Sequence, residues 1–141
     1  MLAQTDDEGD SPLPKQHLRF RWLNEKFAIC RLSPESPIPD WGLKGRFTSI
    51  TRTAEELSIV CPVENVPAEF KPEVPWTCFH LEGPFSLMAT GILASFIGPL
   101  SENGVPIFAI STYDTDYVLI REDFAGMAVP ALQAAGHELI G

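Results

Sequence analysis

The chain has few basic residues and no long hydrophobic run. Its 141 residues include 10 Lys and Arg against 19 Asp and Glu, which gives a formal net charge of −9. Sequence-independent nucleic-acid binding needs Lys and Arg clusters against the phosphates, so the composition argues against a nucleic-acid partner. The longest apolar run, residues 92–100, is broken by Ser95, Gly98 and Pro99. Because a membrane span needs roughly 20 apolar residues, we expect a soluble protein without a membrane partner.

Cysteine and histidine are also scarce and scattered. Cys30, Cys61 and Cys78 form no C-x-x-C pair, and segment 1–14 lacks the basic and apolar parts of a secretion signal. We read that acidic segment as a disordered tail and expect a cytoplasmic location. The histidines lie far apart, and no glycine-rich phosphate loop is present. The sequence therefore predicts no metal site, no cofactor and no catalytic residue.

Proline divides the chain into two halves. Residues 63–75 hold prolines too closely spaced for a helix or a central strand, so they are predicted to be a linker. The first half, residues 15–62, is expected to be mostly strands, with its first helix reduced to a turn near residues 39–43. Residues 24–25 are predicted to form a hairpin turn between the first two strands. The strand-like runs are 18–23, 26–32, 47–52 and 57–61.

The second half, residues 76–141, has a clearer pattern. Its apolar residues alternate in two strand-like segments, run almost unbroken through a third, and recur at helical spacing in two others, before a final short strand. Asp123 is the expected N-cap of the second helix. The order strand, helix, strand, strand, helix, strand predicts an α+β fold of the ferredoxin-like type, with both helices on one face of the sheet. The segments are 76–82, 91–103, 105–111, 117–121, the helix after Asp123, and 137–140.

A candidate ligand site lies at the start of the first helix of this half. Helix N-termini carry unpaired N–H groups that attract anions, so Thr90 and Gly91 are expected to face a carboxylate. Asp114 and Asp116 flank Thr115 in the following hairpin, and one of them facing the same spot would bind an ammonium group. Such a cleft would hold both charged ends of an α-amino acid. Three other readings stay open: Thr90 caps the helix, the aspartates shape the turn, or the aspartates act as an acid and base pair.

Segment 85–120 resembles ACT domains. The signature consists of TGI at residues 90–92 and ISTYDTDYVLI at residues 110–120. The resemblance extends over roughly residues 76–141, and the most similar groups are small bacterial ACT proteins, the regulatory region of lysine-sensitive aspartokinase and the animal arginine sensors of TOR signalling. Through FTSITRTAEELSIVCP at residues 47–62, the first half resembles the partner half of these proteins. The resemblance implies an ACT domain preceded by a smaller ACT-like half.

The resemblance also implies a ligand and the residues that bind it. In the arginine sensors the ligand lies between two ACT units, so a free amino acid is expected between the two halves or at a homodimer interface. The chain has one tandem pair where those sensors have two, and no kinase or dehydrogenase to regulate, so an unidentified partner enzyme is a further candidate. The positions that carry over are Ser58, Ile59, Gly91, Ile92, Thr112, Tyr113, Asp114 and Asp116.

Three functions follow from these observations. The leading hypothesis is a non-enzymatic allosteric sensor that binds an amino acid. The second is an interaction or dimerisation module without a small-molecule ligand. The third, a small hydrolase or isomerase, is the least favoured because no activated base can be named.

Overall fold

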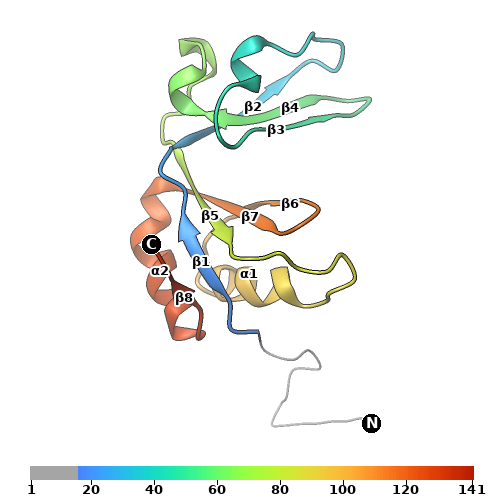
Figure 1. Cartoon of the computed structure of the whole chain (residues 1–141). Helices are drawn as coiled ribbons and strands as arrows, with labels where there is room; N and C mark the ends of the chain where they lie inside the picture. Colours follow the sequence, from blue (N-terminus) through green and yellow to red (C-terminus); the bar gives the residue numbers. More distant parts are fainter. Residues whose placement is uncertain (1–15) are drawn as a thin grey trace.

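The computed structural model describes residues 16–141 and shows two halves that share one mixed β-sheet (Figure 1). The expected tail, residues 1–14, lies outside the described residues. The strands are β1 (Arg19–Trp22), β2 (Phe27–Leu32), β3 (Ser49–Arg52), β4 (Leu57–Pro62), β5 (Trp76–Leu81), β6 (Phe108–Ser111), β7 (Asp116–Arg121) and β8 (Glu138–Leu139). The helices are α1 (Ile92–Glu102) and α2 (Ala125–Ala134), with the 3-10 helices η1 (Asp40–Leu43), η2 (Val63–Asn65), η3 (Ala68–Phe70) and η4 (Glu122–Phe124).

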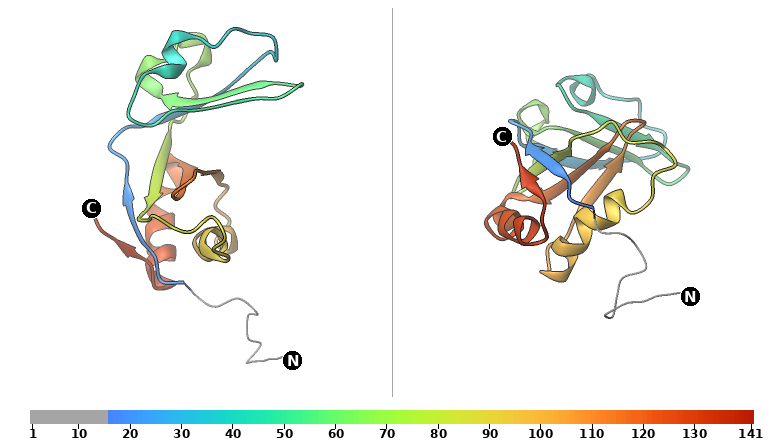
Figure 2. Two further views of the ribbon diagram at one scale, coloured as in Figure 1. Left: turned by 45° about the vertical axis from the view of Figure 1, so that its right-hand side comes forward. Right: turned by 60° about the horizontal axis from the view of Figure 1, so that its bottom comes forward.

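The C-terminal half has the predicted ferredoxin-like order β5, α1, β6, β7, α2, β8. β7 pairs antiparallel with both β5 and β6, and the two α-helices cover the same face of the sheet (Figure 2). The core between sheet and helices contains Phe20, Phe79 and Phe96, all fully buried. Their rings meet edge to face, with centroids 5.2, 5.3 and 5.7 Å apart. This packing fixes the position of α1 against β5.

β1 departs from the expected grouping of residues 15–62. Its Phe20 lies opposite Leu81 in an antiparallel pairing with β5 and opposite Leu139 in a parallel pairing with β8. The C-terminal sheet therefore runs β8-β1-β5-β7-β6. The predicted hairpin turn at residues 24–25 is wrong, because β1 pairs with β5 and β8 and not with β2. At that point the chain crosses from one half to the other.

The N-terminal half repeats part of the same unit in reduced form. β2, η1, β3 and β4 follow one another as β5, α1, β6 and β7 do, and β4 pairs antiparallel with both β2 and β3. η1 lies where the sequence predicts a helix reduced to a turn. Three prolines, Pro34, Pro37 and Pro39, precede it and disfavour helical backbone. Gly42 lets η1 approach β4, since a Cβ there would lie 3.1 Å from Ile59.

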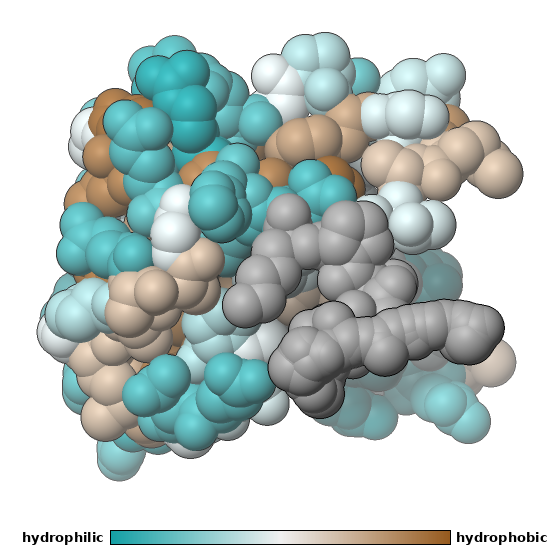
Figure 3. All heavy atoms as spheres, turned by 90° about the horizontal axis from the view of Figure 1, so that it is seen from below, coloured by the Kyte–Doolittle hydropathy of each residue, from teal (hydrophilic) through white to brown (hydrophobic). Residues whose placement is uncertain are grey.

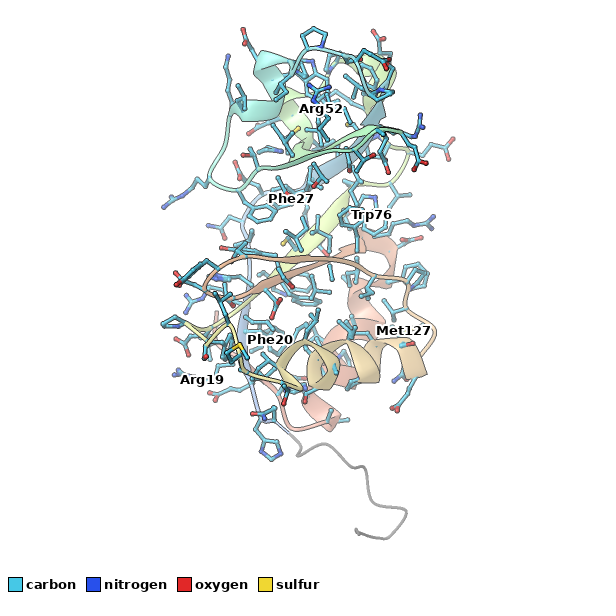
Figure 4. All side chains as sticks on the ribbon, turned by 90° about the vertical axis from the view of Figure 1, so that its right-hand side faces the viewer. Arg19, Phe20, Phe27, Arg52, Trp76 and Met127 are labelled. Carbon is cyan, nitrogen blue, oxygen red and sulfur yellow. The ribbon has the colours of Figure 1, made fainter. Side chains whose placement is uncertain are left out.

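The two halves meet along a narrow seam. β2 joins β5 through the single pair Phe27 opposite Trp76, and both side chains lie where the halves meet (Figure 4). On the helix-free face of the sheet, Phe47 packs against Tyr117 with ring centroids 4.3 Å apart. Buried Phe27 joins the same cluster. Side-chain packing therefore connects the halves in addition to the strand pair.

The proline-rich segment 63–75 is more ordered than a plain linker. It contains η2 and η3, and Val66 is buried in the core of the N-terminal half. The Lys71 ammonium donates a hydrogen bond to the Val63 carbonyl at 2.8 Å. The segment thus covers the N-terminal core before the chain enters β5.

Two further boundaries differ from the sequence-based expectations. The predicted N-cap Asp123 is wrong, because α2 begins two residues later and the Asp123 carboxylate accepts from Arg121 Nε at 3.1 Å. The strand expected at residues 105–111 begins only at Phe108. Pro106 has no N–H to donate to a strand partner, which explains the late start.

All three cysteines are buried as free thiols. Burial raises the pKa of Cys30 and Cys78, and burial together with neighbouring Cys30 raises the pKa of Cys61 to about 11. They therefore stay protonated near neutral pH and act as small apolar residues. Among residues 16–141 there is no group of three or more metal-ligating side chains. No helix in that range is both long enough and apolar enough to cross a membrane.

Candidate functional site

A cleft of about 270 Å³ lies between the loop before α1 and the β6–β7 hairpin. Both segments lie at the same end of the strands β5, β6 and β7, on the right-hand side of Figure 1. The cleft is a little below the 300–1,000 Å³ typical of pockets for drug-sized ligands, about right for a small metabolite. Its walls are formed by Phe85, Ser86, Leu87, Ala89, Gly91, Ile92, Leu93 and Ala94 on the helix side, and by residues 111–116 on the hairpin side.

The helix side of the cleft presents an uncapped N-terminus. Gly91 is the N-cap residue of α1, with a φ of 80° that favours glycine, and no side chain caps this end. The predicted alternative of a Thr90 cap is therefore not found; Thr90 is exposed beside the cleft. Ser95 donates to the Gly91 carbonyl from its amide at 3.0 Å and from its hydroxyl at 2.6 Å. The first amides of α1 have no acceptor within the helix, so the positive end of the helix dipole faces the cleft.

The hairpin side is held in place by bonds within the turn and to the neighbouring strand. The Thr112 amide donates to the Thr115 carbonyl at 2.8 Å, and the Thr115 hydroxyl donates to the Leu81 carbonyl at 2.7 Å. The Phe85 amide donates to the Asp114 carbonyl at 2.7 Å, which ties the loop before α1 to the turn. Both walls of the cleft are thus joined at one end by backbone hydrogen bonds.

Two carboxylates lie on the hairpin wall. Asp116 is half-buried and accepts a hydrogen bond from the Ser111 hydroxyl, and Asp114 is exposed at the tip. Thr112 makes the side-chain bonds that stabilise the turn, with its hydroxyl at 3.1 Å from the Thr115 carbonyl and 3.3 Å from the Thr115 amide. The turn-forming role considered for the aspartates therefore belongs to Thr112, and the carboxylates are left to line the cleft.

The structure brings together six of the nine predicted site residues. Of the other three, Ser58 and Ile59 lie on β4 in the N-terminal half, and Ile59 is fully buried in that half's core. Thr90 adjoins the cleft without lining it. The six residues of the cleft are Gly91, Ile92, Thr112, Tyr113, Asp114 and Asp116.

Sequence reasoning missed Ser111 as a member of the site. It lies directly opposite Asp116 in the β6–β7 pairing and donates to that carboxylate. Its place in the ISTYDTD run was visible in the sequence, and pairing the two strands across the turn would have set it beside Asp116. The hydroxyl holds the carboxylate at the cleft wall.

Two large apolar side chains of the cleft walls, Leu87 and Tyr113, are exposed, as is Met88, which lies in the chain between the lining residues Leu87 and Ala89. Leu87, Met88 and Tyr113 are 63%, 85% and 78% exposed. On the underside of the molecule, hydrophobic patches are interrupted by hydrophilic residues (Figure 3). The apolar group at the cleft opening is thus one of several surface patches, and it is distinguished by its position beside Asp114 and Gly91.

A second hollow lies on the helix-free face of the sheet, with a volume of about 540 Å³. It is lined by Arg21, Arg46, His80 and Tyr117, and the rings of His80 and Tyr117 stack with centroids 4.5 Å apart. Burial and nearby Arg21 lower the pKa of His80. We call this the outer hollow. An adjoining space shares His80 and Tyr117 with the outer hollow and Asp114 with the cleft.

The chemistry of the cleft suits binding. It offers helix amides for an anion, two carboxylates for a cation and hydroxyls from Ser111 and Thr112. Its lining contains neither His nor Cys, the usual bases and nucleophiles at neutral pH. A zwitterion placed between the helix and the hairpin would have both its charges matched.

Comparison with known proteins gives two family matches. An ACT domain model matches residues 73–134, and a model of an N-terminal domain matches residues 25–69. The curated protein named cytosolic arginine sensor for mTORC1 subunit 1 is 31% identical over 98 residues in Bos taurus and 30% identical over 98 residues in Homo sapiens. These matches take in 62% of the chain but only 30% of each sensor.

Two solved structures share the fold. A protein from Agobacterium tumefaciens is 42% identical with a TM-score of 0.82, and the alignment covers 89% of this chain and 93% of that one. A Vibrio cholerae protein of unknown function is 21% identical with a TM-score of 0.67, covering 84% of this chain and 90% of that one. The match across both halves shows that the pair of halves, and not the C-terminal half alone, is the shared unit.

Proposed function

Because the chain belongs to the ACT domain family, we propose that it is a non-enzymatic regulatory protein that binds a free amino acid in the cleft between α1 and the β6–β7 hairpin. The observation that carries the proposal is that Gly91 and Asp116 line one cleft of about 270 Å³. Helix amides receive the ligand's α-carboxylate and Asp116 receives its α-ammonium group. The names of the arginine sensors support an amino acid as the ligand class.

The second carboxylate narrows the choice of amino acid. With Asp116 engaged by the α-ammonium group, exposed Asp114 remains at the same wall for a cationic side chain. A dibasic amino acid such as arginine or lysine then neutralises both carboxylates, while a neutral amino acid leaves Asp114 unpaired. Acidic amino acids are disfavoured because their side chains would meet two like charges.

A thermal-shift panel of the twenty amino acids tests the proposal. A ligand at about 100 times its Kd stabilises the folded protein by about 2.7 kcal/mol, and arginine or lysine should give the largest rise in Tm. Asp116→Asn should weaken binding roughly 30-fold or more, because the charge pair between the carboxylate and the ligand's ammonium group is lost. The unliganded Tm should change little, since Asp116 is half-exposed. Ser58→Ala is the matched control, because Ser58 lies outside the cleft, and it should leave binding unchanged.

The second candidate is a dimerisation or docking module, favoured by the exposed side chains of Leu87, Met88 and Tyr113 around the cleft. We place a second copy of the chain there, so that the homodimer closes the open side of the cleft and the protein acts on an unidentified partner enzyme in the cytoplasm. Met88→Asp should then shift sedimentation from dimer to monomer. A flat amino-acid panel together with a dimer that depends on Met88 would favour the docking function over the sensor.

A further inference from the structure

His137 immediately precedes β8 and is buried between the chain just before β1 and α1, with 4% of its surface exposed. The Leu18 amide donates to its Nδ1 at 3.1 Å, and its Nε2 lies 2.9 Å from the Ser95 carbonyl. Because Nδ1 accepts a hydrogen bond, the ring proton is on Nε2 and is donated to Ser95. The structure therefore holds a neutral imidazole that joins the start of β1 to α1.

This bond replaces one that the helix cannot make. In an α-helix the Ser95 carbonyl would accept from the amide of residue 99, but Pro99 has no N–H. His137 supplies the missing donor from outside the helix. Ser95 in turn bonds twice to the Gly91 carbonyl, from its amide and from its hydroxyl. A continuous chain of hydrogen bonds thus runs from His137 through Ser95 to Gly91, the N-cap residue of α1, which lines the cleft.

The surroundings of the ring favour its neutral form. On α1 it meets the Ser95 carbonyl and the Phe96 ring, which are uncharged. His17, on the chain before β1, is the titratable neighbour whose charge acts on the ring, and Arg19 and Glu138 pair with each other on the surface at 3.7 Å. Burial lowers the pKa of His137, His17 lowers it further, and the bond to Ser95 opposes the shift.

We propose that His137 is a positioning residue of the amino-acid cleft: it holds the first turn of α1 in place through Ser95, and its protonation weakens amino-acid binding. A proton on Nδ1 removes the acceptor for the Leu18 amide and places a charge in the core. The charged ring then moves out of its buried position, and the Ser95 carbonyl loses the hydrogen bond that it accepts from His137. The first turn of α1, whose amides face the ligand's carboxylate, is then no longer held in place. The inference has two parts. The ligand half, that protonation of His137 weakens amino-acid binding, rests on the proposed function; the positioning half, that His137 holds the first turn of α1, does not.

The positioning half is tested without any ligand by NMR between pH 7.5 and pH 5. The imidazole signals of His137, the Leu18 amide and the amides of residues 91–96 should shift together with one midpoint, below the ordinary His value. In His137→Gln, which cannot titrate, the shifts of residues 91–96 should be lost. They should persist in His17→Gln, the matched control. If residues 91–96 stay unchanged while His137 titrates, the inference is overturned.

The ligand half is tested by calorimetric titration of L-arginine at pH 7 and pH 5. The affinity of the wild-type protein should fall about fivefold or more, a usual size for coupling between two sites. His137→Gln should remove most of this pH dependence, and His17→Gln should retain it. A pH dependence that survives in His137→Gln contradicts the inference. Should L-arginine fail to bind at either pH, the proposed function fails for that ligand, and the ligand-free titration still decides the role of His137.

Discussion

The three strands of the N-terminal half, β2, β3 and β4, follow the same order as β5, β6 and β7 of the C-terminal half, but the halves differ at the equivalent position between the first helix and the following hairpin. In the C-terminal half this position is an open cleft of about 270 Å³. In the N-terminal half the loop before η1 is tied to the β3–β4 hairpin by Arg52, whose guanidinium donates to the Pro34 carbonyl and to the Ser36 carbonyl, the latter at 2.9 Å. In the N-terminal half the unit's own arginine side chain thus bridges the loop and the hairpin, whereas in the C-terminal half the equivalent position is an open cleft.

The helices of the two halves differ for a related reason. η1 is a single turn. It packs so closely against β4 that a Cβ on Gly42 would lie 3.1 Å from Ile59. α1 has eleven residues, and its N-terminus is free of any side-chain cap. Only the longer helix presents a full set of aligned peptide dipoles to a ligand. This difference supports the C-terminal half as the place of the proposed amino-acid binding.

The largest expected effect comes from breaking the C-terminal core through β1. Phe20 is fully buried against Phe79 and Phe96, so Phe20→Ala should lower the free energy of unfolding by about 3–5 kcal/mol. Arg19→Ala, one residue away and exposed, should cost less than about 1 kcal/mol. Chemical denaturation measures both. Equal and small effects would show that β1 does not belong to the C-terminal half.

A smaller effect is expected at the start of α1. Gly91 has a φ of 80° and open space around its Cβ position, so Gly91→Ala should cost roughly 1–2 kcal/mol through backbone strain alone. Gly126→Ala, in α2 and with open space around its Cβ position, should instead stabilise the protein by about 0.5–1 kcal/mol. Opposite signs in the two unfolding curves support the left-handed conformation at Gly91. The same sign would contradict it.

Acid should weaken the C-terminal half in particular. The folded-state pKa of His137 and His80 is lowered by burial, so the unfolded chain binds more protons as the pH falls. Their contribution to stability is complete above the unfolded value of about 6.5 and is lost as the pH decreases through the lower folded value. Denaturation at pH 7.5 and pH 5 measures the loss. His137→Gln should reduce it, and an unchanged pH profile in that variant would contradict the assignment.

The smallest effect is expected in the N-terminal half. Arg52 is exposed and donates to two loop carbonyls, so Arg52→Ala should cost about 1 kcal/mol or less. Because the N-terminal position is closed and holds no ligand in the proposed function, amino-acid binding should stay unchanged in a thermal-shift assay. A loss of binding in Arg52→Ala would show that the N-terminal half takes part in the site.

Much of the C-terminal half could be predicted from its sequence, because its signals are local. Apolar spacing at Ile92 and Phe96 marks α1, and the TGI and ISTYDTD motifs place Gly91 and Asp116 at neighbouring turns. The pairing of β1 could not be predicted. Alternation in residues 18–23 tells which face of the strand is buried but not which strand lies beside it, since that choice depends on contacts far away in sequence.

The same limit explains the two site residues that lie elsewhere. Ser58 and Ile59 were assigned by resemblance to the partner half, and Ile59 instead fills the N-terminal core. The role of His137 was equally hidden, because a lone histidine has no spacing pattern. Its proposed role depends on Ser95, whose carbonyl it contacts only in the folded molecule, and on Pro99, which leaves that carbonyl without a donor in the helix.

NMR mapping of L-arginine onto the isotope-labelled chain tests most directly whether the amino acid binds in the C-terminal cleft. The largest amide shifts should fall in residues 91–95 and 111–116, and Asp116→Asn should abolish them. Shifts concentrated on β3 and β4, or around Arg21 and Arg46 in the outer hollow, would contradict the proposed site even if the protein binds arginine.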